Sequence, residues 1–374
     1  MNRRQFLRTS ALAGAGAIAA PMLNLGRFRL FAANAAGYSA RTLEVVGRTT
    51  VVDMLGLLTL DWRKLQHWFR EPASFDDAER RALAESGISV FHPAVEPNDP
   101  DPHAATRRWL GNWNRFLDAR LDAFLRIDGP GDFTRLRADG RLGLLLGFQN
   151  SEHFRTPADV AEFHRLGQRV SQLTYNGGNR LGSGCFDARD RGLTGLGAET
   201  VAAMNLAGMA VDVSHCSERT SLDAIAASAT PVLVTHANCR ALTRHPRCKS
   251  DKVIRALGAR NGVMGITALP AFVRQGGTAT IEHLLDHFDH VARLVGIEHA
   301  GLGTDMDSHP VDPRTRRLRP AYALEGLRHP KRVFDIAEGL LARGYAESDV
   351  EGVLGGNFER ALSAIWTAAP PASA

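Results

Sequence analysis

The sequence "MAVDVSHC" (residues 209–216) runs through apolar residues, passes one acid and ends on a histidine and a cysteine, and "PVLVTHAN" (residues 231–238) again reaches a histidine after an apolar run. Short apolar runs of this kind, bounded by turn residues, are typical of parallel strands that are covered on both faces. A single histidine at the end of a buried strand is usually packed or hydrogen-bonded. Two consecutive strands that both end in histidine indicate a shared site at their carboxyl ends.

These two runs belong to a longer series of apolar runs. The others cover residues 49–58, 88–95, 142–150, 169–176, 262–267 and 299–305, and segments with helical spacing lie among them. Strands that alternate with helices over this length predict an α/β fold, a (β/α)8 barrel of the TIM type. A doubly wound open sheet is the main competitor, but no G-x-G-x-x-G turn follows any run. Residues 36–374 are expected to form this single barrel, with a long loop at 306–330 and helices at the C-terminus.

Enzymes with this fold carry their active sites at the carboxyl ends of the strands, so the polar residues that follow the runs are candidate site residues. In chain order they are Asp53, Gln149, Asn150, Tyr175, Asn176, His215, His236 and Asp305. Two neutral imidazoles beside a carboxylate match the ligand chemistry of zinc. An aspartate on the last strand suits a general base beside a metal-bound water.

A second row of histidines lies outside this set. His283, His287 and His290 follow one another at helical spacing within a segment whose apolar residues form a stripe. Such a row can bind a metal, but barrel helices face outward. We therefore expect this row to form a solvated or interface surface.

The N-terminal segment, residues 1–35, resembles a twin-arginine export signal. Arg3 and Arg4 precede a short Ala- and Gly-rich apolar run that is too short for a membrane span, and Ala33-Asn34-Ala35 fits a cleavage site. This interpretation predicts a periplasmic protein without stable membrane insertion. The segment contains five arginines and no acid, and without it the 45 basic residues fall to 40, equal to the 40 acidic ones. The charge therefore gives no support to nucleic-acid binding.

The four cysteines, Cys185, Cys216, Cys239 and Cys248, form no C-x-x-C pair, which counts against a structural zinc knuckle. In an oxidising compartment one disulfide can form, but the spacing does not select its partners. Cys216 directly follows His215, so along a strand its side chain would face the opposite way and pack in the interior.

Four blocks of the sequence resemble the membrane (renal) dipeptidase family of zinc metallopeptidases. They are "GLGAETVAAMNLAGMAVDVSHCS", "PVLVTHANCRALTRHPR", "AGLGTDMDS" and "VLGGNFERAL", and the similarity extends from about residue 45 to about residue 365. The resemblance implies a (β/α)8 barrel with a binuclear zinc centre that hydrolyses dipeptides, including some with a D-residue on the C-terminal side. It also implies a homodimer, as is common in the family.

By position, the resemblance assigns His215 and His236 to the second zinc and Asp305 to the catalytic proton. Arg247, eleven residues after His236, corresponds to the arginine that binds the carboxylate of the substrate, a role that suits a guanidinium fork. Tyr175 stands where well-known members have a histidine, and its phenol can donate a hydrogen bond to a developing oxyanion. Asn176 and Asn150 would line the substrate pocket.

The first zinc site of the family differs in this chain. The family's first strand ends in Asp-x-His-x-Asp, whereas "DMLGL" (residues 53–57) keeps Asp53 and has Leu55 and Leu57 at the two ligand positions. Gln149 replaces the glutamate that bridges the metals, and a neutral amide is a poorer bridge. One zinc is therefore expected rather than two, held by His215 and His236 with Gln149 or Asp53 as further candidate ligands.

Three functions remain open at this point. The leading hypothesis is a periplasmic metallohydrolase that cleaves a small dipeptide or related amide with a free carboxylate. The second is a non-hydrolytic modification of a peptide-derived metabolite, which the leucines at the first metal site favour. The third is a metal-free periplasmic binding protein that uses the same pocket.

Overall fold

The computed structural model describes residues 37–307, 324–327 and 329–368, and within them eight parallel strand segments form a barrel. Their bounds are β1 (Val52–Asp53), β3 (Val90–Phe91), β5 (Leu142–Leu144) continued by β6 (Gly147–Phe148), β7 (Val170–Gln172), β8 (Ala210–Asp212), β9 (Leu233–Ala237), β10 (Val263–Ile266) and β11 (Ala300–Leu302). β1 pairs with both β3 and β11. On the other side β6 pairs with β7, and Phe148 bridges to Val95 beyond β3, which closes the ring. The predicted α/β barrel is thus confirmed.

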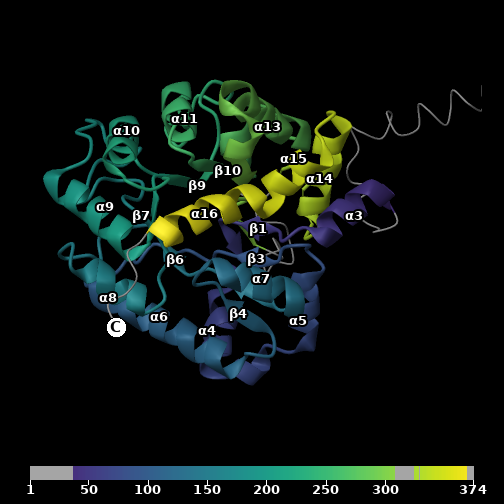
Figure 1. Cartoon of the computed structure of the whole chain (residues 1–374), viewed down its shortest axis with the longest axis horizontal. Coiled ribbons are helices and arrows are strands. Elements are labelled where there is room, and N and C mark those ends of the chain that lie inside the picture. The colour runs from purple at the N-terminus through teal and green to yellow at the C-terminus, as the bar shows by residue number, and fades with distance from the viewer. Residues whose placement is uncertain (1–36, 308–323, 328, 369–374) are drawn as a thin grey trace, which may run out of the picture.

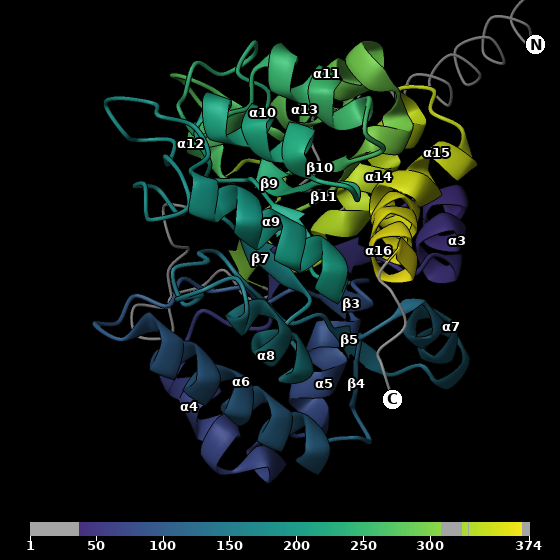
Figure 2. The same cartoon turned by 60° about the vertical axis from the view of Figure 1, so that its left-hand side comes forward.

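Helices surround the strands on the outside (Figures 1 and 2). They are α3 (Ala40–Arg48), α4 (Trp62–Arg70), α5 (Asp77–Ala84), α6 (Pro102–Ala119), α7 (Pro130–Asp139), α8 (Asp159–Arg165), α9 (Gly195–Ala207), α10 (Glu218–Ala227), α11 (Asp251–Gly258), α12 (Pro270–Val273), α13 (Ile281–Val295), α14 (Arg332–Ala342), α15 (Glu347–Glu351) and α16 (Asn357–Ala368). The expected apolar stripe of α13 is buried, with Leu284, Phe288 and Val291 at 1% exposure or less. Amphipathic spacing thus places these helices against the sheet.

The amino-terminal end of the barrel is closed by α16. Phe358, Leu362 and Ile365 of this helix belong to one buried apolar cluster with strand residues such as Val52 and Leu233. In Figure 1 the helix runs across the strands as a yellow ribbon. Because α16 covers the amino-terminal end, the opposite end, where the strands terminate, is the one left for a site.

Two strands were not expected from the sequence. β4 (Phe124–Arg126) adds an edge strand beside β5, outside the ring. Residues 306–307, expected to begin a long loop, instead form β12 (Met306–Asp307), which pairs with β2 (Gly56–Leu57). The predicted start of the loop was wrong because Met306 is buried and pairs with Gly56. The remainder of that loop up to residue 323, and the N-terminal signal segment, lie outside the described residues.

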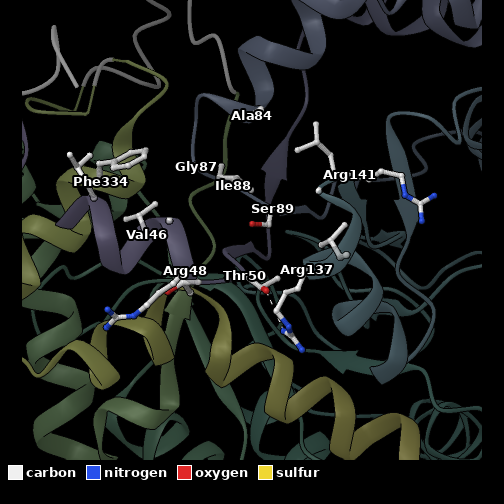
Figure 3. Close-up of a pocket in the computed structure, with 16 residues that line it drawn as sticks. Val46, Arg48, Thr50, Ala84, Gly87, Ile88, Ser89, Arg137, Arg141 and Phe334 are labelled. Carbon is white, nitrogen blue, oxygen red and sulfur yellow. Dashed lines mark hydrogen bonds between the residues drawn. The ribbon is translucent and has the colours of Figure 1, made fainter. Parts of the chain in front are cut away.

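A pocket of about 570 Å³ opens near the amino-terminal ends of β1, β3 and β5 (Figure 3). Thr50 and Ser89, which precede β1 and β3, line it together with Arg137 of α7, whose guanidinium donates to the Thr50 hydroxyl at 3.2 Å. In barrels of this type that end of the sheet contributes stability, whereas chemistry occurs at the other end. We therefore place no reaction in this pocket.

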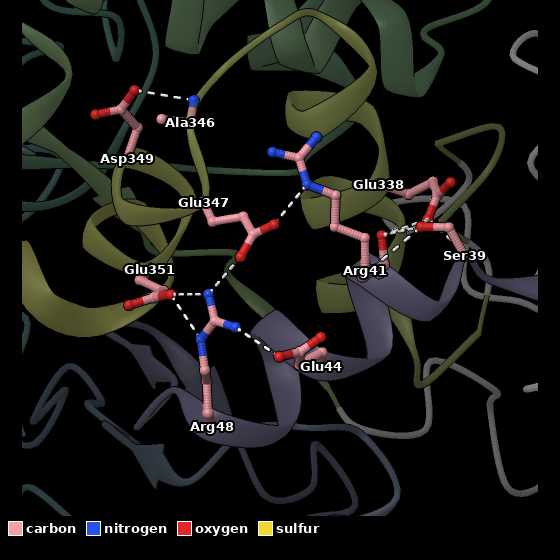
Figure 4. Close-up of polar contacts among 10 residues, drawn as sticks. Ser39, Arg41, Glu44, Arg48, Glu338, Ala346, Glu347, Asp349 and Glu351 are labelled. Atoms are coloured by element: carbon pink, nitrogen blue, oxygen red, sulfur yellow. Dashed lines mark hydrogen bonds and ion pairs between the residues drawn. The ribbon is translucent and has the colours of Figure 1, made fainter.

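The first described helix is tied to helices near the end of the chain (Figure 4). Arg41 and Arg48 of α3 form ion pairs with Glu347 of α15, at 2.7 and 2.6 Å. The hydroxyl of Ser39, the N-cap of α3, donates to Glu338 of α14 at 2.9 Å. None of the described helices is long and apolar enough to cross a membrane.

Candidate metal centre

The histidines that end two consecutive strand segments meet in the structure. His215 lies in the turn after β8, His236 lies within β9, and their Nε2 atoms are 3.0 Å apart. His215 is 6% exposed and His236 is fully buried. Gly303 makes room beside them, because a side chain there would collide with the carbonyl oxygen of Thr235. The two imidazoles thus share one buried position at the carboxyl end of the barrel.

Hydrogen bonds fix the proton positions on both rings. His215 Nδ1 lies 2.8 Å from Asn176 Oδ1, an atom that only accepts, so Nδ1 is the protonated nitrogen. His236 Nδ1 lies 2.9 Å from the Thr235 hydroxyl, which already donates its proton to Asp212 at 2.7 Å. His236 Nδ1 therefore donates as well. The Nε2 atoms of both rings carry lone pairs that face each other.

Two opposed lone pairs at this distance need a proton or a cation between them. A shared proton is disfavoured because burial, followed by the positive charge of Arg247, lowers the pKa of both His215 and His236 well below the usual value. Neutral imidazole nitrogens oriented by hydrogen bonds on their far side are the usual ligands of zinc. The pair therefore fits a divalent metal ion.

The protein side chains provide two ligands and not a complete shell. Within the described ranges, no group of three or more His, Cys, Asp or Glu side chains is arranged to hold a metal. A catalytic zinc typically has three protein ligands and one open position. The two histidines consequently leave more than one position for water, for substrate or for a nearby carboxylate.

Asp305 lies beyond β11 in a left-handed backbone conformation, with φ of 57°. This conformation is uncommon for a residue other than glycine and often marks a functional site. Its backbone N–H donates to the carbonyl of Leu55 at 3.0 Å. Burial raises the pKa of Asp305 to about 7, an effect that Asp53 increases and Arg247 opposes. Asp305 can thus gain or lose a proton near neutral pH.

Tyr175 stacks on His215, with ring centroids 4.3 Å apart and planes inclined by 19°. Burial, followed by the negative charges of Asp305 and Glu96, raises the pKa of Tyr175, so its phenol stays protonated and can donate. Asn176, which was expected to line the pocket, holds His215 through its side-chain oxygen. This contact orients the imidazole of His215, and the pocket-lining role of Asn176 stays a prediction.

Arg247, expected to bind a carboxylate, is only 2% exposed. Its two terminal nitrogens donate to the carbonyls of Ser214 and His236, at 2.5 and 2.8 Å. Its Nε is buried without a hydrogen-bond partner among the described residues. The guanidinium also lies over the Phe272 ring, 5.4 Å from the centroid. Arg247 therefore supports the backbone beside both histidines and leaves its Nε–H donor unused.

The remaining strand-end residues are engaged in the framework. Both carboxylate oxygens of Asp53 accept hydrogen bonds from Thr304, and one also accepts from the backbone of Leu55. Gln149 donates from its amide to the carbonyl of Ala94 at 3.0 Å. Asn150 accepts from Asn179 at 2.8 Å and from the backbone of Glu152 at 3.2 Å. Among the described residues, none of these three side chains forms a hydrogen bond with His215 or His236, so their ligand and substrate roles stay predictions.

Leu55 and Leu57 form a small buried apolar cluster with Ala94, against which Leu60 packs. They are 1% and 8% exposed. This surface offers no electron pair to a metal. It lies directly after Asp53, where β1 ends.

Sequence reasoning missed the residues that hold the histidines in place. Asp212 accepts from the backbone and the hydroxyl of both Ser214 and Thr235. Lys249 donates to backbone carbonyls on either side of His215. A signal existed, because polar residues stand immediately before each histidine in "DVSH" and "TH".

The histidine row on α13 was expected to be a surface, which is wrong for His287. That ring is fully buried, accepts from the backbone of Cys239 at 3.1 Å and donates to the carbonyl of Val273 at 3.0 Å. His290, partly exposed, contacts Asp251 at 2.8 Å. His287 faces inward because it shares the buried stripe with Phe288. All four cysteines are free thiols, and Cys216 is buried as expected.

Comparison with known proteins identifies one family for most of the chain. The model described as membrane dipeptidase, peptidase family M19, matches residues 73–374. The chain is 30% identical over 272 residues to the uncharacterized dipeptidase C965.12 of Schizosaccharomyces pombe, covering 70% of this chain and 60% of that protein. It is 31% identical over 333 residues to dipeptidase verJ of Clonostachys rogersoniana, covering 80% and 81%. A solved amidohydrolase from Pseudomonas aeruginosa has a TM-score of 0.74 at 27% identity, covering 87% of this chain and 99% of its own.

Proposed function

Because this chain belongs to the membrane dipeptidase family, peptidase family M19, we propose that it hydrolyses a small dipeptide or a related amide with a free carboxylate, using one zinc ion held by His215 and His236. The observation that carries the proposal is the 3.0 Å separation between the Nε2 atoms of two buried imidazoles. A zinc ion at this position would lower the pKa of a bound water and supply hydroxide at neutral pH.

The surroundings of three other residues support a role for each. Asp305, with its pKa raised to about 7, would take a proton from the attacking water and return it to the leaving amine. Tyr175 would donate its phenol proton to the oxygen on which negative charge develops. The unused donor of Arg247, together with its charge, would hold the carboxylate of the substrate.

A single metal is supported by the residues at the other half of the site. Leu55 and Leu57 stand at the ligand positions that the family resemblance identifies and form an apolar cluster instead. Gln149 supplies a neutral amide in place of the bridging carboxylate. With those three changes, an ion at the family's first zinc site would lose the histidine and the two carboxylates that the resemblance assigns to it.

The same leucines favour a second candidate, a reaction that rearranges a peptide-derived substrate without adding water. A metal-free binding protein is the third possibility. The mature chain is proposed to be periplasmic, exported by the twin-arginine route, and to form a homodimer. Support for the location comes from Arg3, Arg4 and the apolar run that follows.

The proposal is tested with a panel of dipeptides that includes substrates with a C-terminal D-residue. Product masses are measured by mass spectrometry, and bound metal is measured by elemental analysis. Hydrolysis adds the mass of one water, rearrangement leaves the mass unchanged, and a binding protein releases the dipeptide intact. We expect hydrolysis and about one zinc per chain, as in single-zinc hydrolases. Protein without zinc, or products of unchanged mass, would refute the leading proposal.

A further inference from the structure

Lys249 is a buried cation that the proposed reaction does not use. It is 3% exposed, and its ammonium donates to three neutral oxygens. These are the carbonyls of Val213 and Cys216, at 2.6 and 2.9 Å, and the hydroxyl of Ser221, at 3.1 Å. All three donors of the ammonium are therefore used. Placing a charge in the interior is costly, so its presence calls for a reason.

The two carbonyls flank the turn that carries His215. Val213 precedes Ser214 and His215, and Cys216 follows them. Arg247, two residues before Lys249, donates to the carbonyls of Ser214 and His236. We call Arg247 and Lys249 together the cationic bracket. It binds the carbonyls of the β8 turn on both sides of the imidazole and also reaches β9.

The backbone of Lys249 is fixed independently of its side chain. Its N–H donates to the carbonyl of Asn238 at 2.8 Å, and its own carbonyl accepts from Arg240 at 2.8 Å. Residues 238–240 follow β9 directly. The intervening Cys248 turns away, with its thiol 3.6 Å from the carbonyl of Phe272. The ammonium thus connects the end of β9 to the β8 turn and, through Ser221, to α10.

From this geometry we infer that Lys249 is a positioning residue for His215, which directs the imidazole toward His236 by fixing the two carbonyls beside it. The inference rests on the proposed function for the metal it serves. The direction of His215, however, can be measured in the absence of metal. Residues behind metal ligands typically change metal affinity 10- to 100-fold when they are replaced.

The test is Lys249→Met, which keeps the length of the side chain and removes the charge and the donors. Zinc affinity is measured by chelator competition, and imidazole ¹⁵N shifts report which ring nitrogen of His215 is protonated. We expect zinc to bind roughly 10- to 100-fold more weakly. We also expect His215 to lose its single Nδ1-protonated form while His236 keeps it. Lys249→Gln retains amide donors, so its zinc affinity should lie between those of the wild type and Lys249→Met. It replaces Lys249→Met in the test if the methionine variant does not fold.

Asn205→Ala is the matched control. Asn205 of α9 is also buried and ties a loop, donating to Ser228 at 3.1 Å and Thr230 at 3.0 Å, but this loop precedes β9, at the amino-terminal end of the barrel. Unchanged zinc affinity and an unchanged His215 spectrum in folded Lys249→Met or Lys249→Gln would overturn the inference, as would equal changes in Asn205→Ala. If the wild type binds no zinc, the proposed function fails and the His215 spectrum alone decides the role of Lys249.

Discussion

The phenol ring of Tyr175 lies flat against the imidazole of His215, with 4.3 Å between the ring centroids. This contact places the ring that carries a neutral hydroxyl donor beside a proposed metal ligand. Tyr175→Phe keeps the ring contact and removes only the donor. We expect kcat to fall about 100-fold, as for loss of one oxyanion donor, with metal content unchanged. Steady-state kinetics with elemental analysis check this, and a kcat within threefold of the wild type would exclude the role.

We expect His215 and His236 to be the side chains that hold the metal ion. Replacement of His215 or His236 by alanine leaves one imidazole and should abolish stoichiometric zinc in purified protein. His290→Ala is the matched control, because His290 is a partly exposed histidine that contacts Asp251 on the outer helices. His287 does not suit this purpose, since its burial makes any replacement destabilising. Comparable zinc loss in all variants would show that the ion is held elsewhere.

Because of Asp305, we expect the free energy of unfolding to decrease as the pH rises. The pKa of Asp305 is raised to about 7 in the folded protein, whereas an unfolded aspartate titrates near 3.9. Between these values the folded state binds more protons, so this group stabilises the fold at low pH and loses that contribution as the pH rises from about 4 to 7. Asp305→Asn should therefore be more stable than the wild type at pH 8, by about 4 kcal/mol, with little difference at pH 4. Urea denaturation at the two pH values measures this.

The charge of Arg247 should affect the pH dependence of the reaction through Asp305. Arg247 lowers the pKa of Asp305, so Arg247→Gln should raise that pKa. The rise of kcat/KM with increasing pH should therefore shift to higher pH. The substitution should also raise KM at least 10-fold more for dipeptides with a free carboxylate than for their C-terminal amides. Equal effects on acids and amides would leave Arg247 only its contacts with the carbonyls of Ser214 and His236.

Much of this arrangement could be predicted from the sequence, and the reason is periodicity. Apolar runs ending in polar residues locate the strands and their tips, which is how His215, His236 and Asp305 were found. Side-chain partners are different, because hydrogen bonds depend on rotamers that no spacing encodes. Asn176 and Lys249 are neighbours of His215 only after the loops have folded.

The region between β3 and β5 was the least predictable part. α6 was not anticipated, although Leu110, Trp113 and Phe116 recur on one face and are buried. Its aromatic residues pack on those of α4, with Trp113 and Phe69 centroids 4.9 Å apart. A helix that packs on another helix, and an edge strand outside the ring, fall outside the strand–helix alternation of the barrel. The burial of His287 was also not predicted, because the row that it forms with His283 and His290 suggested an exposed surface.

The ion pairs between α3 and α15 have a consequence for biosynthesis. Arg41 and Arg48 are translated 306 and 299 residues before their partner Glu347. Helix α3 therefore cannot form these ion pairs until α15 has been synthesised. A variant truncated before α15 would leave Arg41 and Arg48 without Glu347, so α3 and α15 must be engineered together.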